Sequence, residues 1–172
     1  MKGEEYKPRG RATARLLFCA AMLICSGALA VPEIDQPAPP LKGTLLSGQS
    51  LDLAQLRGKV VLLNFYSSYC KYCAYEIGNL ETIYERYRAD GLEVIELAID
   101  ELADRGRVQR MLSIYHLPGT MVDDLRESGF ERRYPTPTAF LIDRKGVLRH
   151  KQWGAKTASY FKEILLPLLR EQ

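Results

Sequence analysis

Two cysteines separated by two residues, Cys70 and Cys73, are the side chains of this sequence best suited to chemistry. The chain has four cysteines, and the other two, Cys19 and Cys25, lie in an apolar N-terminal stretch. A protein that uses disulfides as staples spreads its cysteines along the chain, whereas this pair stands at one point, directly after the apolar run 60–65. The spacing therefore indicates thiols that react rather than thiols that hold structure.

The two-residue spacing has a physical reason. A predicted strand delivers the chain to a short loop, residues 67–69, and a helix is predicted to begin at Cys70. The first turn of a helix has free N–H groups and the positive end of the helix dipole, and both stabilise a thiolate. One helical turn brings Cys73 beside Cys70, so that the two sulfurs can close a disulfide. In this scheme Cys70 attacks a substrate disulfide and Cys73 resolves the mixed disulfide.

The elements that must position this pair follow from the apolar pattern. Residues 60–66 are typical of a central strand buried on both faces, and residues 70–89 predict a helix with one apolar stripe. Residues 41–56 predict a short hairpin, or a strand with a turn of helix. Further along we expect a strand at 92–99, a helix at 103–115, a short strand at 120–123, a short polar helix at 124–133, a β-hairpin of 139–142 and 147–152, and a helix at 156–170 disturbed by Pro167. This order predicts the α/β class, with a mixed central β-sheet flanked by helices on both faces.

Composition divides the chain into a leader and one domain. Residues 1–15 include five Lys or Arg, residues 16–32 carry no charge, and this run contains the small-x-small pattern Ala28-Leu29-Ala30. These are the parts of a secretory signal peptide, and the alternative is an uncleaved membrane anchor, although the uncharged run is short for a span. Both place the domain outside the cytoplasm. We expect a signal peptide or membrane anchor at 1–30, a Pro-rich linker at 31–40 and one domain at 41–172.

The charge of the domain disfavours one class of partner. Without residues 1–30 the chain keeps 19 Lys+Arg (24 minus 5) and 19 Asp+Glu (21 minus 2), so the formal charge of +3 belongs to the leader. A protein that binds nucleic acid needs a basic face. We therefore expect no nucleic-acid partner, and we expect the domain to act as a monomer.

Two stretches resemble a known family. Residues 56–66 (LRGKVVLLNFY) followed by the C-x-x-C, and residues 134–143 (YPTPTAFLID), resemble the thioredoxin superfamily in its extracytoplasmic TlpA/ResA-like branch. The resemblance spans residues 40–170. It implies a thioredoxin-like fold with an N-terminal β extension and a helical insert before a cis-proline loop. It also implies a thiol–disulfide oxidoreductase without a cofactor. In much of this branch the protein reduces disulfide-bearing proteins, such as apocytochrome c, and is itself re-reduced by a membrane thiol electron donor.

The resemblance assigns further site residues. Pro137 matches the family's cis-proline, whose loop faces the C-x-x-C and leaves the backbone of Thr136 free to pair with an extended substrate. Glu76 matches an acid that lies three positions after the second cysteine, where it can tune the thiol pKa and shuttle protons. Asn64 stands where thioredoxins themselves carry a buried acid. Because an amide cannot act as a base, that role shifts to Glu76 and leaves Asn64 a supporting residue.

The residues around the motif depart from the family pattern. Tyr69 stands where thioredoxins have Trp, Gly78 stands where this branch often has Pro, and Lys71-Tyr72 replaces the thioredoxin Gly-Pro. Lys71 adds a positive charge beside Cys70, which favours the thiolate and the reduced form. Tyr69 and Tyr72 are candidates for an aromatic rim that contacts a partner protein, with core packing as the alternative.

Other functions use the same cysteine spacing. A structural zinc site needs four ligands, and His116 and His150 are isolated, so we expect no metal site of this kind. Haem attachment fails because Ala74, not His, follows Cys73. Two alternatives stay open. One is a disulfide oxidant or isomerase that uses the same residues at a higher reduction potential. The other is a copper-binding carrier of this fold, although that class uses C-x-x-x-C with a histidine.

Overall fold

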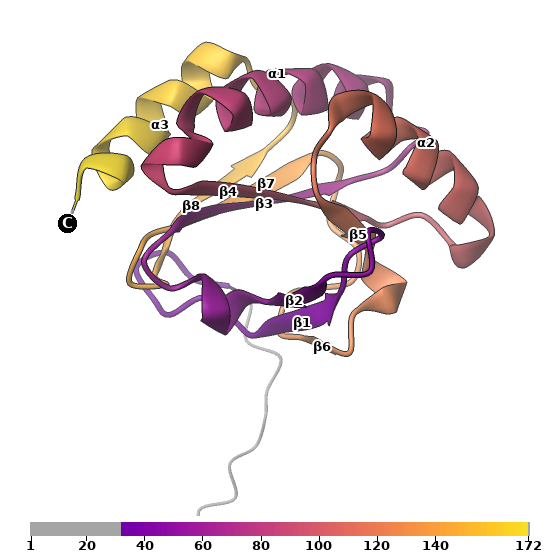
Figure 1. Cartoon of the computed structure of the whole chain (residues 1–172), viewed down its shortest axis with the longest axis horizontal. Coiled ribbons are helices and arrows are strands. Elements are labelled where there is room, and N and C mark those ends of the chain that lie inside the picture. The colour runs from indigo at the N-terminus through magenta and orange to yellow at the C-terminus, as the bar shows by residue number, and fades with distance from the viewer. Residues whose placement is uncertain (1–31, 172) are drawn as a thin grey trace, which may run out of the picture.

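A five-stranded sheet lies at the centre of the computed structural model, which describes residues 32–171 (Figure 1). The middle strand β3 pairs with β4 in parallel and with β7 in antiparallel orientation, so the sheet is mixed as predicted. Every residue of β3 is buried, because the strand has neighbours on both edges and a packed layer on each face. In spatial order the strands are β5 (Gly119–Met121), β4 (Leu92–Ala98), β3 (Val60–Tyr66), β7 (Thr138–Ile142) and β8 (Leu148–Trp153).

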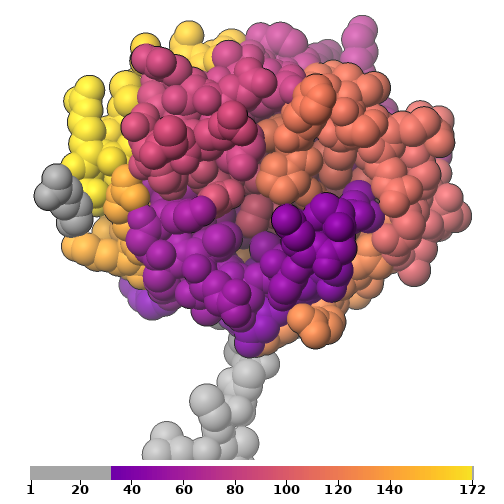
Figure 2. Space-filling model, in the orientation of Figure 1, coloured from indigo at the N-terminus to yellow at the C-terminus, as the bar shows by residue number. Residues whose placement is uncertain are grey.

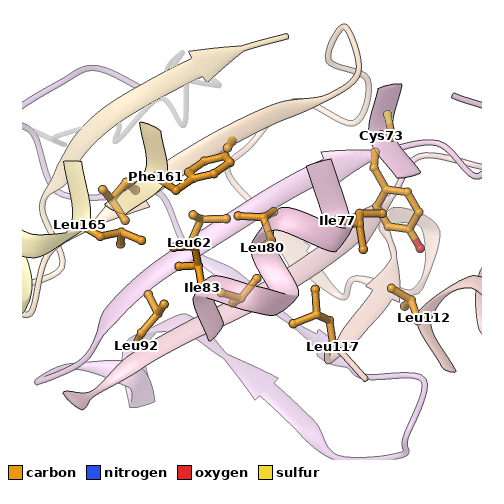
Figure 3. Packing of buried hydrophobic residues seen from close by; sticks show 14 of the residues in the cluster. Leu62, Cys73, Ile77, Leu80, Ile83, Leu92, Leu112, Leu117, Phe161 and Leu165 are labelled. Atoms are coloured by element: carbon orange, nitrogen blue, oxygen red, sulfur yellow. The ribbon is translucent and has the colours of Figure 1, made fainter. Parts of the chain in front are cut away.

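Three α-helices cover one face of this sheet: α1 (Lys71–Tyr87), α2 (Arg105–Tyr115) and α3 (Ala158–Arg170) (Figure 1). Their apolar stripes meet the sheet in one core cluster, where Leu62 of β3, Leu80 of α1 and Phe161 of α3 are all fully buried (Figure 3). Burying each such side chain contributes about 1.5–3 kcal/mol. Cys73 belongs to the same cluster, so the helix that carries the cysteine pair is fixed to the sheet by its buried face.

A small three-stranded sheet covers the opposite face, with strand order β2-β1-β6. Between the two sheets lies an aromatic cluster in which Phe65 contacts Tyr134 with ring centroids 4.8 Å apart, and Phe130 contacts Phe140 at 5.2 Å. Figure 2 shows the N-terminal segment of the domain, in indigo and purple, along the lower part of the molecule. The strands of the small sheet are β1 (Leu41–Thr44), β2 (Ser50–Asp52) and β6 (Glu127–Ser128), and the single-turn helices of the chain are η1 (Leu53–Leu56), η2 (Arg88–Asp90), η3 (Leu102–Asp104) and η4 (Val122–Asp124).

Two expectations about the second face are wrong. Helices do not cover both faces, because all three α-helices of the described residues lie on the α1 face. The short polar helix expected at 124–133 does not form: the single turn η4 ends at Asp124, and strand β6 follows. The backbone of this segment bonds to the N-terminal extension instead of to itself, since Arg126 N donates to Lys42 O and Gly129 N donates to Pro40 O, each at 2.8 Å. Residues 124–133 thus pair with the N-terminal β extension instead of forming the expected helix.

The remaining elements agree with the sequence expectation at the level of type and order. The hairpin β7–β8 turns at Gly146. Its φ of 76° is a left-handed backbone conformation, which glycine adopts without the steric cost that a Cβ atom would bring. Pro167 lies inside α3 without ending it. The segment expected as a linker at 31–40 is attached to the domain in part, because Asp35 N donates to Leu148 O and Ala38 N to Gly146 O. The leader expected at 1–30 lies outside the described residues.

A search of residues 32–171 for a membrane span finds none, since no helix there combines the required length with the required apolar character.

Candidate active site

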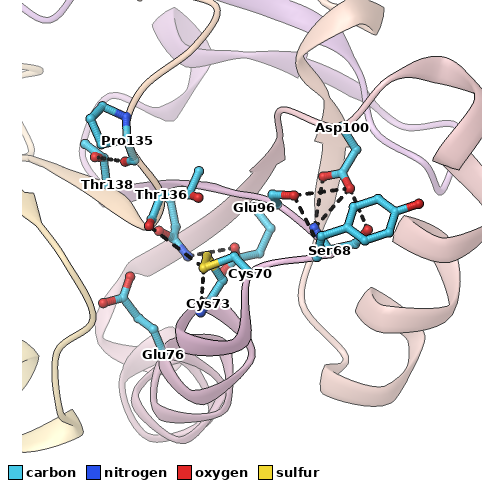
Figure 4. The surroundings of a disulfide bond; sticks show 12 residues. Ser68, Cys70, Cys73, Glu76, Glu96, Asp100, Pro135, Thr136 and Thr138 are labelled. Carbon is cyan, nitrogen blue, oxygen red and sulfur yellow. Dashed lines mark hydrogen bonds between the residues drawn. A yellow bond between two sulfur atoms is a disulfide. The ribbon is translucent and has the colours of Figure 1, made fainter.

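The cysteine pair stands at the N-terminus of α1, where the sequence places it. Cys70 is the N-cap residue, and its Sγ accepts a hydrogen bond from Cys73 N at 3.2 Å. Cys70 and Cys73 are joined by a disulfide, with their Cα atoms 5.2 Å apart (Figure 4). Cys70 is partly exposed, whereas Cys73 is completely buried. This difference makes Cys70 the sulfur that an incoming thiolate or disulfide can reach.

Asp100 holds the loop that leads from β3 to Cys70. Its carboxylate accepts hydrogen bonds from Ser68 N at 3.0 Å and from Ser68 Oγ at 2.5 Å (Figure 4). Asp100 follows β4, which runs parallel to β3, and the carboxyl ends of parallel strands meet at one edge of a sheet. Sequence reasoning missed this residue, although an acid directly after the second parallel strand was a usable signal.

Tyr69 and Tyr72, the two candidates for an aromatic rim, differ in their contacts. The Tyr69 hydroxyl donates to Asp104 Oδ1 at 2.6 Å, and the Arg107 guanidinium lies 4.4 Å from the Tyr69 ring centroid. These contacts hold Tyr69 on the helical insert that contains α2, although 64% of its surface is exposed. Tyr72 is 70% exposed and lies in the first turn of α1, between the two cysteines in sequence.

The proline loop faces the disulfide. The Thr136–Pro137 peptide bond is cis, as expected, and the carbonyl oxygen of Thr136 lies 3.8 Å from Cys70 Sγ (Figure 4). Pro137 is buried, and its carbonyl accepts a hydrogen bond from Gly154 N at 2.9 Å. The loop between Tyr134 and β7 therefore lies against the reactive sulfur, and the partly exposed Thr136 is the residue of that loop next to it.

Glu76 is a buried acid one turn after Cys73. Only 1% of its surface is exposed, and its Oε2 accepts a hydrogen bond from Lys156 N at 2.7 Å. Burial raises the pKa of Glu76 to about 7, against the opposing effect of that hydrogen bond. A carboxyl with this pKa exchanges protons at neutral pH, which suits it to general acid–base work beside a thiol.

Asn64 and Glu96 form a buried pair on neighbouring strands. Asn64 Nδ2 donates to Glu96 Oε2 at 2.9 Å, and both side chains are fully buried. Burial raises the pKa of Glu96 well above its usual value, with a smaller contribution from the charge of Glu76. Sequence reasoning placed Asn64 as a supporting residue but missed Glu96, whose signal was a single charged residue within the apolar strand 94–99.

No group of three His, Cys, Asp or Glu side chains within residues 32–171 is arranged to hold a metal ion.

Known proteins of similar sequence are thiol–disulfide oxidoreductases. The model of the AhpC/TSA family matches residues 34–151. The thiol-disulfide oxidoreductase ResA of Bacillus cereus is 31% identical over 88% of this chain and 95% of its own length. The protein of the same name from Halalkalibacterium halodurans is 31% identical over 70% of this chain and 68% of its own length.

Solved structures share the fold. A thiol:disulfide interchange protein of the thioredoxin family from Chlorobium tepidum aligns with a TM-score of 0.67 at 22% identity, over 81% of this chain and 99% of its own. A secreted disulfide oxidoreductase from Mycobacterium tuberculosis aligns with a TM-score of 0.61 at 21% identity, over 74% of this chain and 95% of its own. The dithiol at a helix N-terminus, the cis-proline loop and these relatives lead to one conclusion: the chain belongs to the AhpC/TSA family and is a thioredoxin-like thiol–disulfide oxidoreductase similar to ResA.

Proposed function

We propose that this protein is an extracytoplasmic reductant of protein disulfides. The observation that carries the proposal is the buried acid Glu76, which lies one turn after the resolving cysteine. A strong disulfide oxidant stabilises its reduced form, mainly as a thiolate. An acid that ionises near neutral pH beside a sulfur disfavours the thiolate, and the nearby cation Lys71 is exposed, where water screens its charge. The site therefore gives up electrons more readily than an oxidant's site does.

The reaction has two exchange steps. The Cys70 thiolate attacks one sulfur of the substrate disulfide, forms a Cys70–substrate bond and releases the other substrate sulfur as a thiolate, which takes a proton from water. Glu76 then accepts the proton of the Cys73 thiol, and the Cys73 thiolate attacks Cys70 Sγ. This forms the Cys70–Cys73 disulfide and releases the second substrate sulfur as a thiolate, which takes a proton from water. The substrate gains two electrons, and the protein is left oxidised.

The substrate class follows from the loop beside Cys70. A partly exposed backbone at Thr136, next to the reactive sulfur, suits an extended chain that adds a short β-pairing, with Tyr72 available for contact. Unfolded or extended proteins with a disulfide fit this description, and apocytochrome c is one such substrate. The proposal places the domain, as a monomer, in the periplasm or at the outer face of the cytoplasmic membrane. Residues 1–30 act as signal or anchor, and a membrane thiol donor re-reduces the protein.

Substrate trapping tests this proposal. A Cys73→Ala variant keeps the nucleophile but cannot resolve the mixed disulfide, so it should retain protein substrates that a reducing agent releases. Trapped partners that carry disulfides and are exported would support the proposal. Capture of cytoplasmic proteins alone, from cells that express the full chain, would contradict it. A Cys70→Ala variant is the matched control and should capture nothing.

A further inference from the structure

A second buried acid lies behind the disulfide and takes no part in the exchange described above. Glu96 belongs to β4 and faces the helix layer, on the same side of the sheet as Asn64 and Tyr66. In Figure 4, Glu76 extends from the helix and Glu96 from the sheet, and both lie near the Cys70–Cys73 pair. A carboxyl group in an apolar core is costly unless it is neutral or paired, so its presence needs a reason.

The surrounding strands are built to accommodate Glu96. Asn64 is its register partner on β3 and donates to Oε2 at 2.9 Å. Gly119 is its register partner on β5, and a Cβ at that position would lie 2.6 Å from the Glu96 carbonyl oxygen and 2.9 Å from Glu96 Cβ. A larger residue at 119 would displace the strand that carries the acid. Asn64 thus fixes the carboxyl group, and Gly119 leaves space for the backbone and Cβ of Glu96.

Unpartnered polar atoms gather at this place. Within residues 32–171, the buried side-chain atoms without a hydrogen-bond partner are Asn64 Oδ1, Tyr66 OH, Glu76 Oε1 and Glu96 Oε1. The two acids interact electrostatically, because the charge of Glu76 adds to burial in raising the pKa of Glu96. The pKa of Tyr66 is also raised, first by burial and then by the charges of Glu96 and Asp100. Buried acceptor oxygens in one cluster are tolerated when a proton lies among them.

The groups that face Glu96 are mostly acids or neutral. β3 contributes Tyr66 and the neutral Asn64, and α1 contributes Glu76 and the buried Cys73. The buried side chains that α2 and β5 add to this cluster are apolar: Val108, Leu112 and Met121. No Lys or Arg side chain in the described part of the chain forms an ion pair with Glu96. A proton is therefore the group that can neutralise it.

We propose that Glu96 is the proton reserve of the dithiol: it keeps a neutral carboxylic acid beside Glu76 and resupplies Glu76 with a proton when Glu76 gives one to Cys73. The step belongs to re-reduction. A donor dithiol attacks Cys70 Sγ as a thiolate, and the Cys73 sulfur leaves with the electron pair and takes the proton of Glu76. Glu96 passes its proton to Glu76, and water later reprotonates Glu96 with the proton that the donor lost. The second donor thiol then attacks the donor sulfur of the mixed disulfide and breaks its bond to Cys70, which leaves as a thiolate and takes the proton of that thiol. The donor ends as a disulfide and the protein as a dithiol.

Glu96 acts only through Glu76, because it passes its proton to that residue and does not touch the reacting sulfurs. It concerns the exchange chemistry itself, so it holds whether the protein serves as a reductant or an oxidant in the cell.

A pH-dependent comparison of variants tests the reserve. Oxidised wild-type protein and Glu96→Gln are reduced with excess dithiothreitol, and the ratio of their rates cancels the ionisation of the reagent. At about pH 5.5 Glu76 carries its own proton, so the two rates should agree within about twofold. At about pH 8.5 Glu76 is ionised and depends on Glu96, so Glu96→Gln should be about tenfold slower or more. A ratio that is the same at both pH values would overturn the proposal, since a merely structural effect has no such pH dependence.

Glu93→Gln is the matched control, because Glu93 lies on the same strand but pairs with Lys59 at the edge of the core. It should keep the wild-type rates at both pH values.

Infrared spectroscopy tests the reserve in the unaltered protein, without reliance on a variant that folds. At about pH 8, wild-type protein labelled with [13C]glutamate should show the carbonyl stretch of a neutral glutamic acid, since the reserve requires a protonated Glu96 and this side chain is fully buried without an ion-pair partner among the described residues. In folded Glu96→Gln this band should be absent. A wild-type spectrum without the band, or a band that persists in the variant, shows that Glu96 holds no proton and overturns the proposal.

Discussion

The backbone N–H of Lys156 donates a hydrogen bond to Glu76 Oε2 at 2.7 Å, and this contact joins the segment before α3 to the helix that carries the cysteines. It fixes one oxygen of a buried carboxyl one turn after Cys73 and leaves Oε1 without a partner in the described residues. The carboxyl is thereby held in place while burial raises its pKa to about 7. An acid fixed in this way can take and return a proton without moving.

Substitution of Glu76 should remove the pH dependence of the resolving step. In the wild type, attack of Cys73 on a mixed disulfide should accelerate as the pH rises through about 7, because the ionised Glu76 accepts the thiol proton. Glu76→Gln should lose this inflection and resolve about 100-fold more slowly at pH 7.5. The measurement is the release of thiol from a pre-formed mixed disulfide with a small peptide. Glu85→Gln, on the exposed side of α1, is the control, and an unchanged profile in Glu76→Gln would contradict the role.

The raised pKa of Glu76 also predicts how stability depends on pH. The folded protein binds this proton up to about pH 7, whereas the unfolded chain releases it near 4.5, so the free energy of unfolding falls as the pH rises between those values. The loss amounts to about 3 kcal/mol and is absent in Glu76→Gln. Urea unfolding of both oxidised proteins at about pH 5 and pH 8 measures it. The prediction fails if the two proteins differ in stability by the same amount at both pH values.

Cys70 and Cys73 should differ in reactivity because they differ in exposure. In the reduced protein, iodoacetamide should modify the partly exposed Cys70 and leave the fully buried Cys73 unmodified until the protein unfolds. Peptide mapping after brief alkylation at pH 7 identifies the modified residue. Preferential modification of Cys73 would reverse the assignment of nucleophile and resolving cysteine.

Asp100 should stabilise the loop before Cys70. Asp100→Ala removes the acceptor of Ser68 N and Ser68 Oγ, which should lower the free energy of unfolding by about 1–3 kcal/mol. Adding Ser68→Ala to that variant should cost little more, because the two residues act through one contact. Asp104→Ala, which removes the partner of the exposed Tyr69 hydroxyl, is the control and should cost less than about 1 kcal/mol. Additive effects of Asp100→Ala and Ser68→Ala would contradict this arrangement.

The sequence predicts the fold well where local pattern and burial agree. The apolar run 60–66 and the helical stripe after Cys70 identify β3 and α1, because each element buries its side chains with its own period. The motif around Pro137 identifies the loop that faces Cys70. The polar segment 124–133 is misassigned because its backbone partners, Lys42 and Pro40, lie far away in sequence. The secondary-structure propensity of a short segment does not reveal pairing with a strand that is distant in sequence.

The buried acids show a similar limit within the site. Glu76 is recognised because it follows Cys73 at a fixed spacing on one helix. Asp100 and Glu96 approach the site only through the parallel pairing of β3 with β4, so their roles depend on tertiary register. A charged residue inside an apolar strand is the sequence signal that points to Glu96, since such a residue needs a buried partner. The sequence identifies its partner, Asn64, as a site residue, but it does not show that Asn64 and Glu96 are paired, because that pairing depends on the register of β3 and β4.

The reduction potential of the Cys70–Cys73 pair tests the proposed function most directly. Purified protein is equilibrated with glutathione or dithiothreitol couples of known ratio, and the reduced fraction is counted after alkylation. A reductant should give a two-electron potential well below roughly −200 mV, on the reducing side of the range for thioredoxin-like proteins. A value near roughly −120 mV would identify an oxidant and contradict the proposal.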